Sequence, residues 1–247
     1  WAAVILLVAS VVVLLGLAAR PLHHPASSWR QRWPLQDFAD AYLWRAAAPL
    51  ALAVGSGALL VAVHSDGNAR PLPYVPLLNP TDITVALALA ACALWRARLV
   101  QGTLVVPAAV CSPRWTWVLA GLGFVAFNTV WLRAVHHWAG VPWNAHALFD
   151  SFLVQAGYSI LWSLLALGLM LWAVRRAARS VWMGGAGLLG LVVLKLFVVD
   201  LSNRGGSERI VAFIAVGVLM LVVGYFAPLP PATPPVRGEP EPEQENA

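Results

Sequence analysis

The sequence predicts an all-α fold: a polytopic bundle of about seven transmembrane helices. Of its 247 residues, 60% are hydrophobic and only 11% are charged, whereas a soluble domain carries about 25% charged residues. Several uncharged apolar runs reach roughly 20 residues, the length at which an α-helix crosses the hydrocarbon core. The net charge of +5 comes almost entirely from arginines between these runs. That pattern is typical of membrane topology, so no nucleic-acid partner is expected.

The expected spans cover residues 1–19, 46–63, 80–95, 115–132, 151–174, 181–199 and 210–227. The start of the third span is the clearest, because Asn79 can act as N-cap, Pro80 suits the first helical position and Asp82 meets the helix dipole. Glycine-rich stretches at 55–57 and 184–187 allow neighbouring helices to approach closely. Residues 228–247 are rich in proline and glutamate, so this tail is expected to be disordered.

The connections differ in character. Residues 20–45 alternate aromatic and charged side chains, which suits the headgroup region. Residues 64–79 contain three prolines that prevent a regular helix, residues 99–112 are expected to form an interfacial loop, and residues 136–150 are rich in His and Trp. The chain opens at Trp1 inside an apolar run without a basic signal-peptide region. We therefore expect it to be the C-terminal part of a longer protein, whose missing N-terminal spans would be its partners.

The arginine and lysine counts predict the orientation. The first, third and fifth connections carry four, three and three basic residues, and the second, fourth and sixth carry one, one and two. Because basic residues are retained in the cytoplasm, the N-terminus is expected outside and the C-terminus inside. Arg133 counts here as the basic residue of the fourth connection.

With this topology, acidic and imidazole side chains gather at the outer ends of the spans. They are Asp66, Asp82, Asp150, Asp200, Glu208, His64, His136, His137 and His146. One interpretation is an outward-facing polar pocket, as helix bundles often form. The other is that acids simply occupy loops from which arginine is excluded.

Lys195 is the only lysine of the chain and falls inside the sixth expected span. A charge in hydrocarbon costs at least a few kcal/mol, so such a side chain usually faces protein or water and has a partner. Asp200 lies roughly 140° around the helix from it, which makes Asp82 or Asp150 the better candidate by depth. The alternative is that Lys195 snorkels to the outer headgroups.

No metal or cofactor is expected. His146 and Asp150 are four residues apart, so with His136 and His137 they could share a site, but no HExxH motif is present. The chain contains neither a P-loop nor a dinucleotide glycine pattern at a strand-helix junction. Two cysteines, Cys92 and Cys111, form neither a disulfide framework nor a zinc cluster.

Several segments resemble a known family. They are residues 71–80 (PLPYVPLLNP), 135–139 (VHHWA), 155–163 (QAGYSILWS), 193–202 with its KLFVVDLS string, and 208–224 (ERIVAFIAVGVLMLVVG). They are similar to the bacterial predicted membrane proteins called domain of unknown function 2339. The resemblance implies a long, many-spanning protein of the bacterial inner membrane and cell envelope, and it supplies no activity. It implies that the characteristic motifs include Lys195, Asp200, Glu208, Arg209, Tyr74, Asn79, His136 and His137.

Three functions remain open. The chain could move or sense a solute through the outer pocket, act as an envelope enzyme on a lipid-linked or glycan substrate at the outer leaflet, or serve as a scaffold without activity. An enzyme would use Asp66, Asp150 or His136 as acid or base, whereas a transporter would show broken spans near the midplane. The candidate pocket comprises Lys195, Asp200, Asp82, Asp150, His136, His137, His146, Tyr74, Asn79, Glu208 and Arg209.

Overall fold

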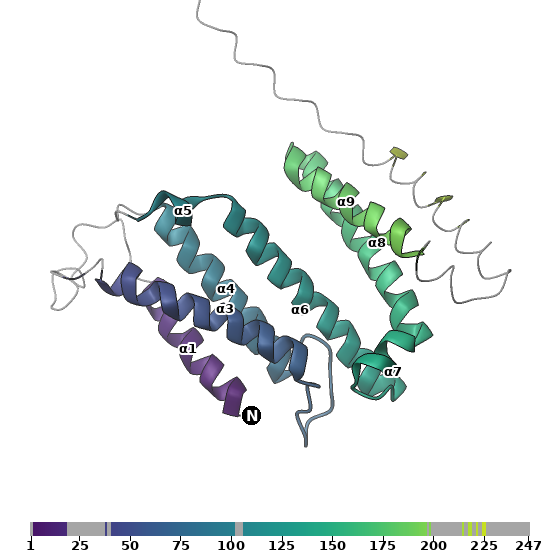
Figure 1. Cartoon of the computed structure of the whole chain (residues 1–247), viewed down its shortest axis with the longest axis horizontal. Helices are drawn as coiled ribbons and strands as arrows, with labels where there is room; N and C mark the ends of the chain where they lie inside the picture. Colours follow the sequence, from purple (N-terminus) through teal and green to yellow (C-terminus); the bar gives the residue numbers. More distant parts are fainter. Residues whose placement is uncertain are drawn as a thin grey trace, which may run out of the picture. The chain divides into compact units, whose positions relative to one another are not determined.

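The computed structural model describes residues 2–18, 38, 41–101, 106–196 and 198, with isolated positions 214, 217, 218, 221, 224 and 225. This part of the chain contains helices and no strand, which confirms the all-α prediction (Figure 1). The chain divides into two compact units, Trp1–Val154 and Gln155–Ala247, and each is described by itself. The elements are α1 (Ala2–Ala18), the π-helix η1 (Ala41–Ala46), α3 (Ala47–His64), α4 (Pro80–Gln101), α5 (Ala108–Cys111), α6 (Arg114–Ala139), α7 (Ala145–Asp150), α8 (Phe152–Arg175) and α9 (Arg179–Lys195).

Four helical segments of the described chain are long and apolar enough to cross a membrane: Ala41–His64, Pro80–Gln101, Arg114–Ala139 and Phe152–Arg175. Helix α1 is apolar but shorter. At most 39% of each apolar window is buried inside the structure, so the remaining apolar side chains face outward. A helix that is hydrophobic all round belongs in lipid, and the protein is therefore a helical membrane bundle.

Small residues bring the helices of the first unit together. Ala47, Ala51 and Ala58 form a buried stripe on α3, and Ala88 and Ala91 do so on α4. Short side chains let helix backbones approach closely, which is the main source of packing energy within a bilayer. Leucines and valines of α1 fill the remaining space, and α6 packs on both α3 and α4. The N-terminal end of α1 lies beside the C-terminal end of α3 (Figure 1).

Several helix ends differ from those expected from the sequence. Helix α4 continues past Trp95 to Gln101, and within this extension the partly buried Arg96 donates to the carbonyl of Ser112 (2.9 Å). Trp95 stacks on Trp44 and donates to the carbonyl of Leu43 (3.1 Å), so helical structure also begins earlier, at Ala41. Part of the expected loop 99–112 is therefore helical. The expected spans 1–19 and 151–174 correspond closely to α1 and α8.

Helix α6 also extends beyond its expected end at residue 132 and stops at Ala139, where Gly140 adopts a left-handed conformation (φ +70°). This moves Arg133 out of the fourth connection and into a helix. The sixth expected span corresponds to α9 up to Lys195. The seventh expected span and the tail lie outside the described residues, apart from the isolated positions.

In the second unit, α8 and α9 pack through Ala166, Met170 and Leu189. Lys195 at the end of α9 donates to the carbonyl of Gln155 (2.8 Å) and to the hydroxyl of Ser159 (2.9 Å), both near the start of α8. These contacts bring the end of α9 to the start of α8, so the two helices are antiparallel. Polar groups of α8 thus compensate the lysine charge.

Close packing of α8 and α9 depends on Gly185. A Cβ at this position would lie 2.7 Å from Met170 Cγ and 3.0 Å from the carbonyl oxygen of Ala166, whereas Gly187 has no described atom within 4 Å. We expect Gly185→Ala to lower the free energy of unfolding by about 1–3 kcal/mol, the usual penalty for overpacking. Gly187→Ala should instead stabilise by up to about 1 kcal/mol through helix propensity. Thermal unfolding in detergent measures both, and equal effects would contradict the packing role.

Candidate polar site at the end of the first unit

The site lies where the loop 65–79, between α3 and α4, meets the C-terminal end of α6. Three prolines keep this loop from forming a helix, and the buried Asn79 closes it. The Asn79 side chain accepts from the amide of Thr81 (2.8 Å) and donates to the carbonyl of Gly67 (2.6 Å). Asn79 therefore acts as the expected N-cap of α4 and also ties the two ends of the loop together.

A buried ion pair forms the base of the site. Arg133 of α6 is 1% exposed and pairs with Asp82 of α4 at 2.5 Å. Its Nε atom donates to the carbonyl of Ser65 (3.0 Å), and Nη2 donates to the carbonyl of Ala62 (2.6 Å). These carbonyls end α3, where backbone oxygens have no intrahelical donor. Arg133 thus caps α3 and neutralises Asp82 at the same time.

Asp82 is surrounded by donors. Besides Arg133, its carboxylate accepts from the Tyr74 hydroxyl (3.2 Å) and the Leu77 amide (3.3 Å), and it lies in the positive first turn of α4. The cation paired with Asp82 is therefore Arg133. This corrects one sequence interpretation, because Arg133 is a buried helical residue and not part of a connection. The expected span ends at residue 132, so the arginine count assigns Arg133 to a connection. In the structure α6 continues to Ala139.

An aromatic stack joins the ion pair to the loop. Tyr74 stacks on His137 with ring centroids 4.5 Å apart, and its hydroxyl also donates to the carbonyl of Val130 (3.3 Å). Burial raises the pKa of the Tyr74 phenol above its ordinary value, and the adjacent Asp82 carboxylate raises it further. The phenol therefore stays protonated and remains a hydrogen-bond donor to Asp82.

Each of the two histidines bonds to a backbone carbonyl. His137 Nε2 lies 2.8 Å from the carbonyl oxygen of Asp66, and His136 Nδ1 lies 2.7 Å from that of Val141. Because a carbonyl oxygen only accepts, these ring nitrogens must carry the proton. In the neutral form, the other nitrogen of each ring is then an acceptor. The two rings meet edge to face at 4.8 Å.

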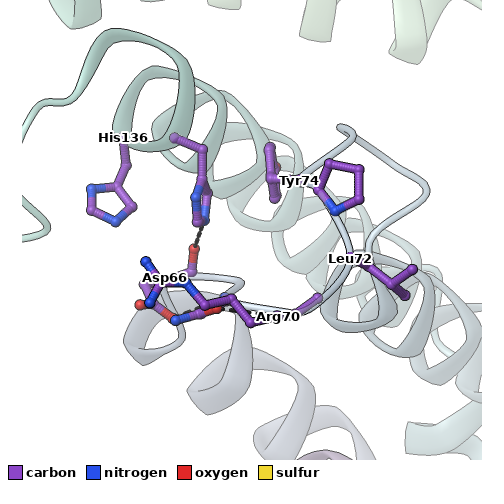
Figure 2. Close-up of a pocket in the computed structure, with 9 residues that line it drawn as sticks. Asp66, Arg70, Leu72, Tyr74 and His136 are labelled. Carbon is purple, nitrogen blue, oxygen red and sulfur yellow. Dashed lines mark hydrogen bonds between the residues drawn. The ribbon is translucent and has the colours of Figure 1, made fainter.

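A pocket of 280 Å³ opens between the loop and the end of α6 (Figure 2). Figure 2 shows the labelled side chains of Asp66, Arg70, Tyr74 and His136 around it. Its lining is mostly polar and comprises Asp66, Asn68, Ala69, Arg70, Leu72, Pro73, Tyr74, His136 and His137. Such a cavity, with several convergent polar groups, is the kind of feature that binds small molecules.

The structure brings together part of the expected site. Tyr74, Asn79, Asp82, His136 and His137 lie within one network. His146 and Asp150 are exposed on α7 and do not line the pocket. Lys195 belongs to the second unit, and Asp200, Glu208 and Arg209 lie outside the described residues. Among the residues that the structure describes, no group of three His, Cys, Asp or Glu side chains could hold a metal ion.

The sequence interpretation did not include Arg133, Gly67 or Arg70 in the candidate pocket. A signal for Arg133 was available, because Thr129, Arg133 and His137 follow one another at intervals of four and so share one face of a continued helix. The Asp66-Gly67 dipeptide is a turn signal that favours a positive φ at the glycine. The 2.7 Å between a Cβ at Gly67 and Arg133 Cδ has no such signal and arises from tertiary packing.

A family model described as "Predicted membrane protein (DUF2339)" matches residues 1–230. The chain belongs to this family. The match confirms the resemblance inferred from the sequence motifs, and it covers both units of the DUF2339 chain. No curated protein and no solved structure shows a significant match.

The ion pair of this DUF2339 protein can be tested by a double-mutant cycle. We expect Arg133→Met and Asp82→Asn each to lower the free energy of unfolding by about 3–5 kcal/mol, because each leaves a buried charge without its partner. The double variant removes both charges and should be more stable than the Arg133→Met variant. Chemical unfolding in detergent measures the coupling. Additive losses would contradict a direct interaction.

Two glycines with similar backbones provide a matched test of the contact with Arg133. Gly67 and Gly140 both have positive φ, but only Gly67 has described atoms where a Cβ would stand. Gly140→Ala should cost about 1 kcal/mol, the strain of a left-handed alanine. Gly67→Ala should cost about 1–3 kcal/mol more, because the new methyl group displaces Arg133. Thermal unfolding measures the loss of stability in each variant, and equal losses would refute the steric role of Gly67.

Proposed function

We propose that this DUF2339 chain is a solute-sensing module of a bacterial inner membrane, and that its pocket faces the outside of the cell. The arginine distribution supports the orientation, since the loop 65–79 and the connection after α6 are the arginine-poor second and fourth connections. Both meet at one end of the first unit, as even-numbered connections should. The C-terminal tail would then lie in the cytoplasm.

Tyr74 carries the sensing proposal. Its side chain lines the pocket, and its hydroxyl donates to Asp82 in the ion pair with Arg133. Any ligand that changes the position of Tyr74 or of the stacked His137 therefore acts on the contacts that join α3, α4 and α6. A sensor needs such a physical link between a binding site and a multi-helix contact.

The other candidate functions have less support. Transporters bind their substrates at broken helices near the midplane, whereas α4 and α6 run without interruption beside this site. An enzyme at the outer leaflet needs an acid and a base directed at one reacting atom. In this pocket, one nitrogen of each imidazole is already committed to a backbone carbonyl. A scaffold would explain the ion pair, but it gives no role to the pocket.

A ligand screen tests the proposal. The full chain in nanodiscs should gain thermal stability with at least one member of a library of small polar solutes, because a ligand that binds the folded state stabilises it. That gain should disappear in His137→Ala and in His136→Ala. It should persist in His146→Ala, the matched control, since His146 is exposed outside the pocket. A gain that survives all three variants would place binding elsewhere and overturn the proposal.

A further inference from the structure

Two opposite charges line the pocket without neutralising each other. Asp66 and Arg70 both contribute to its wall, yet the one ion pair within the described residues joins Arg133 to Asp82. Because the two side chains form no ion pair with each other, both charged groups are available to a ligand in the pocket.

Side-chain hydrogen bonds fix the backbone between Asp66 and Arg70. Asp66 Oδ1 accepts from the amide of Asn68 (3.0 Å), and Asn68 Oδ1 accepts from the amide of Arg70 (3.2 Å). These are two successive side-chain turns, each of which fixes the direction of the chain. The carbonyl of Asp66 is held in addition by His137. The positions of the two charges on the loop are therefore set by the fold before any ligand arrives.

The two histidines that line the pocket add hydrogen-bond acceptors to it. Because His136 and His137 each donate through one nitrogen to a carbonyl, the remaining nitrogen of each neutral ring can only accept. An ammonium group offers three donors and no acceptor, so it matches a carboxylate together with imidazole acceptors. The guanidinium of Arg70 offers only donors and matches a carboxylate or phosphate.

We propose that the pocket binds a small zwitterion with a primary ammonium group near Asp66 and an anionic oxygen group near Arg70. The cavity of 280 Å³ lies just below the roughly 300–1,000 Å³ of drug-sized sites, which fits a molecule of this size. Two sources share this chemistry: a free amino acid, and the ethanolamine phosphate headgroup of a membrane lipid. The inference rests on the proposed function and names the class of ligand for the same site.

The test uses calorimetry on the full chain in nanodiscs of phosphatidylcholine and phosphatidylglycerol. The zwitterionic probes are glycine and glycerophosphoethanolamine, and the single-charge probes are glycinamide and acetate. We expect one zwitterion to bind at least about tenfold more tightly (about 1.4 kcal/mol) than either single-charge probe, because only the zwitterion makes charged hydrogen bonds to both Asp66 and Arg70. Binding of glycine alone identifies an amino acid, and binding of glycerophosphoethanolamine alone identifies a lipid headgroup.

Substitutions of Asp66 and Arg70 test which group of the ligand each side chain binds. Asp66→Asn, which keeps the oxygen that accepts from Asn68, should weaken zwitterion binding at least tenfold and leave acetate binding unchanged. Arg70→Gln should weaken zwitterion binding and leave glycinamide binding unchanged. Asp150→Asn and Arg114→Gln change exposed residues outside the pocket and serve as controls. If a variant fails to fold, the probe series on the unmodified protein decides alone.

The inference is overturned if neither zwitterion binds, or if glycinamide or acetate binds as tightly as both zwitterions. It is also overturned if both pocket variants retain full affinity. The proposed function still holds after such a result if the solute screen finds a ligand whose binding requires His136 and His137. The proposed function fails separately, when no solute depends on either histidine.

Discussion

The buried ion pair between Arg133 and Asp82 is the interaction on which the first unit depends. Removing two charges from water costs several kcal/mol for each ion, so the pair is tolerated only if every polar atom around it is satisfied. Arg133 meets this condition by binding Asp82 and the last carbonyls of α3. Asp82 meets it through Tyr74 and the Leu77 amide. The pair thereby fixes α3, α4 and α6 to one another at one end.

The same constraint positions the pocket. The loop 65–79 must bring the carbonyl of Ser65, the hydroxyl of Tyr74 and the amide of Leu77 to the ion pair, and Gly67 makes room for Arg133. Asp66 and Arg70 belong to the same loop, and with Tyr74 they line the pocket. The base of the site is rigid and fully bonded, and its wall carries the groups that a ligand can reach. A site of this kind is preorganised.

The second unit binds a charged side chain through different contacts. Lys195 binds a backbone carbonyl and a hydroxyl of α8, both neutral groups. The carbonyl of Gln155 also accepts from the Ser159 hydroxyl (3.2 Å), and a carbonyl oxygen has two lone pairs with which to accept both bonds. In both units the charge is met by polar groups of a neighbouring helix, as the low dielectric of a bilayer requires.

The sequence by itself determined the all-α membrane class, most of the helices, the N-cap at Asn79 and the family. These features follow from local composition, hydrophobic length and short motifs, which do not depend on distant contacts. It also indicated that Tyr74, Asp82, His136 and His137 matter. Only the tertiary structure decided that Asp82 pairs with Arg133 and that Gly67 leaves room for this arginine. Both contacts join residues more than 50 positions apart in the chain, whose proximity no local pattern records.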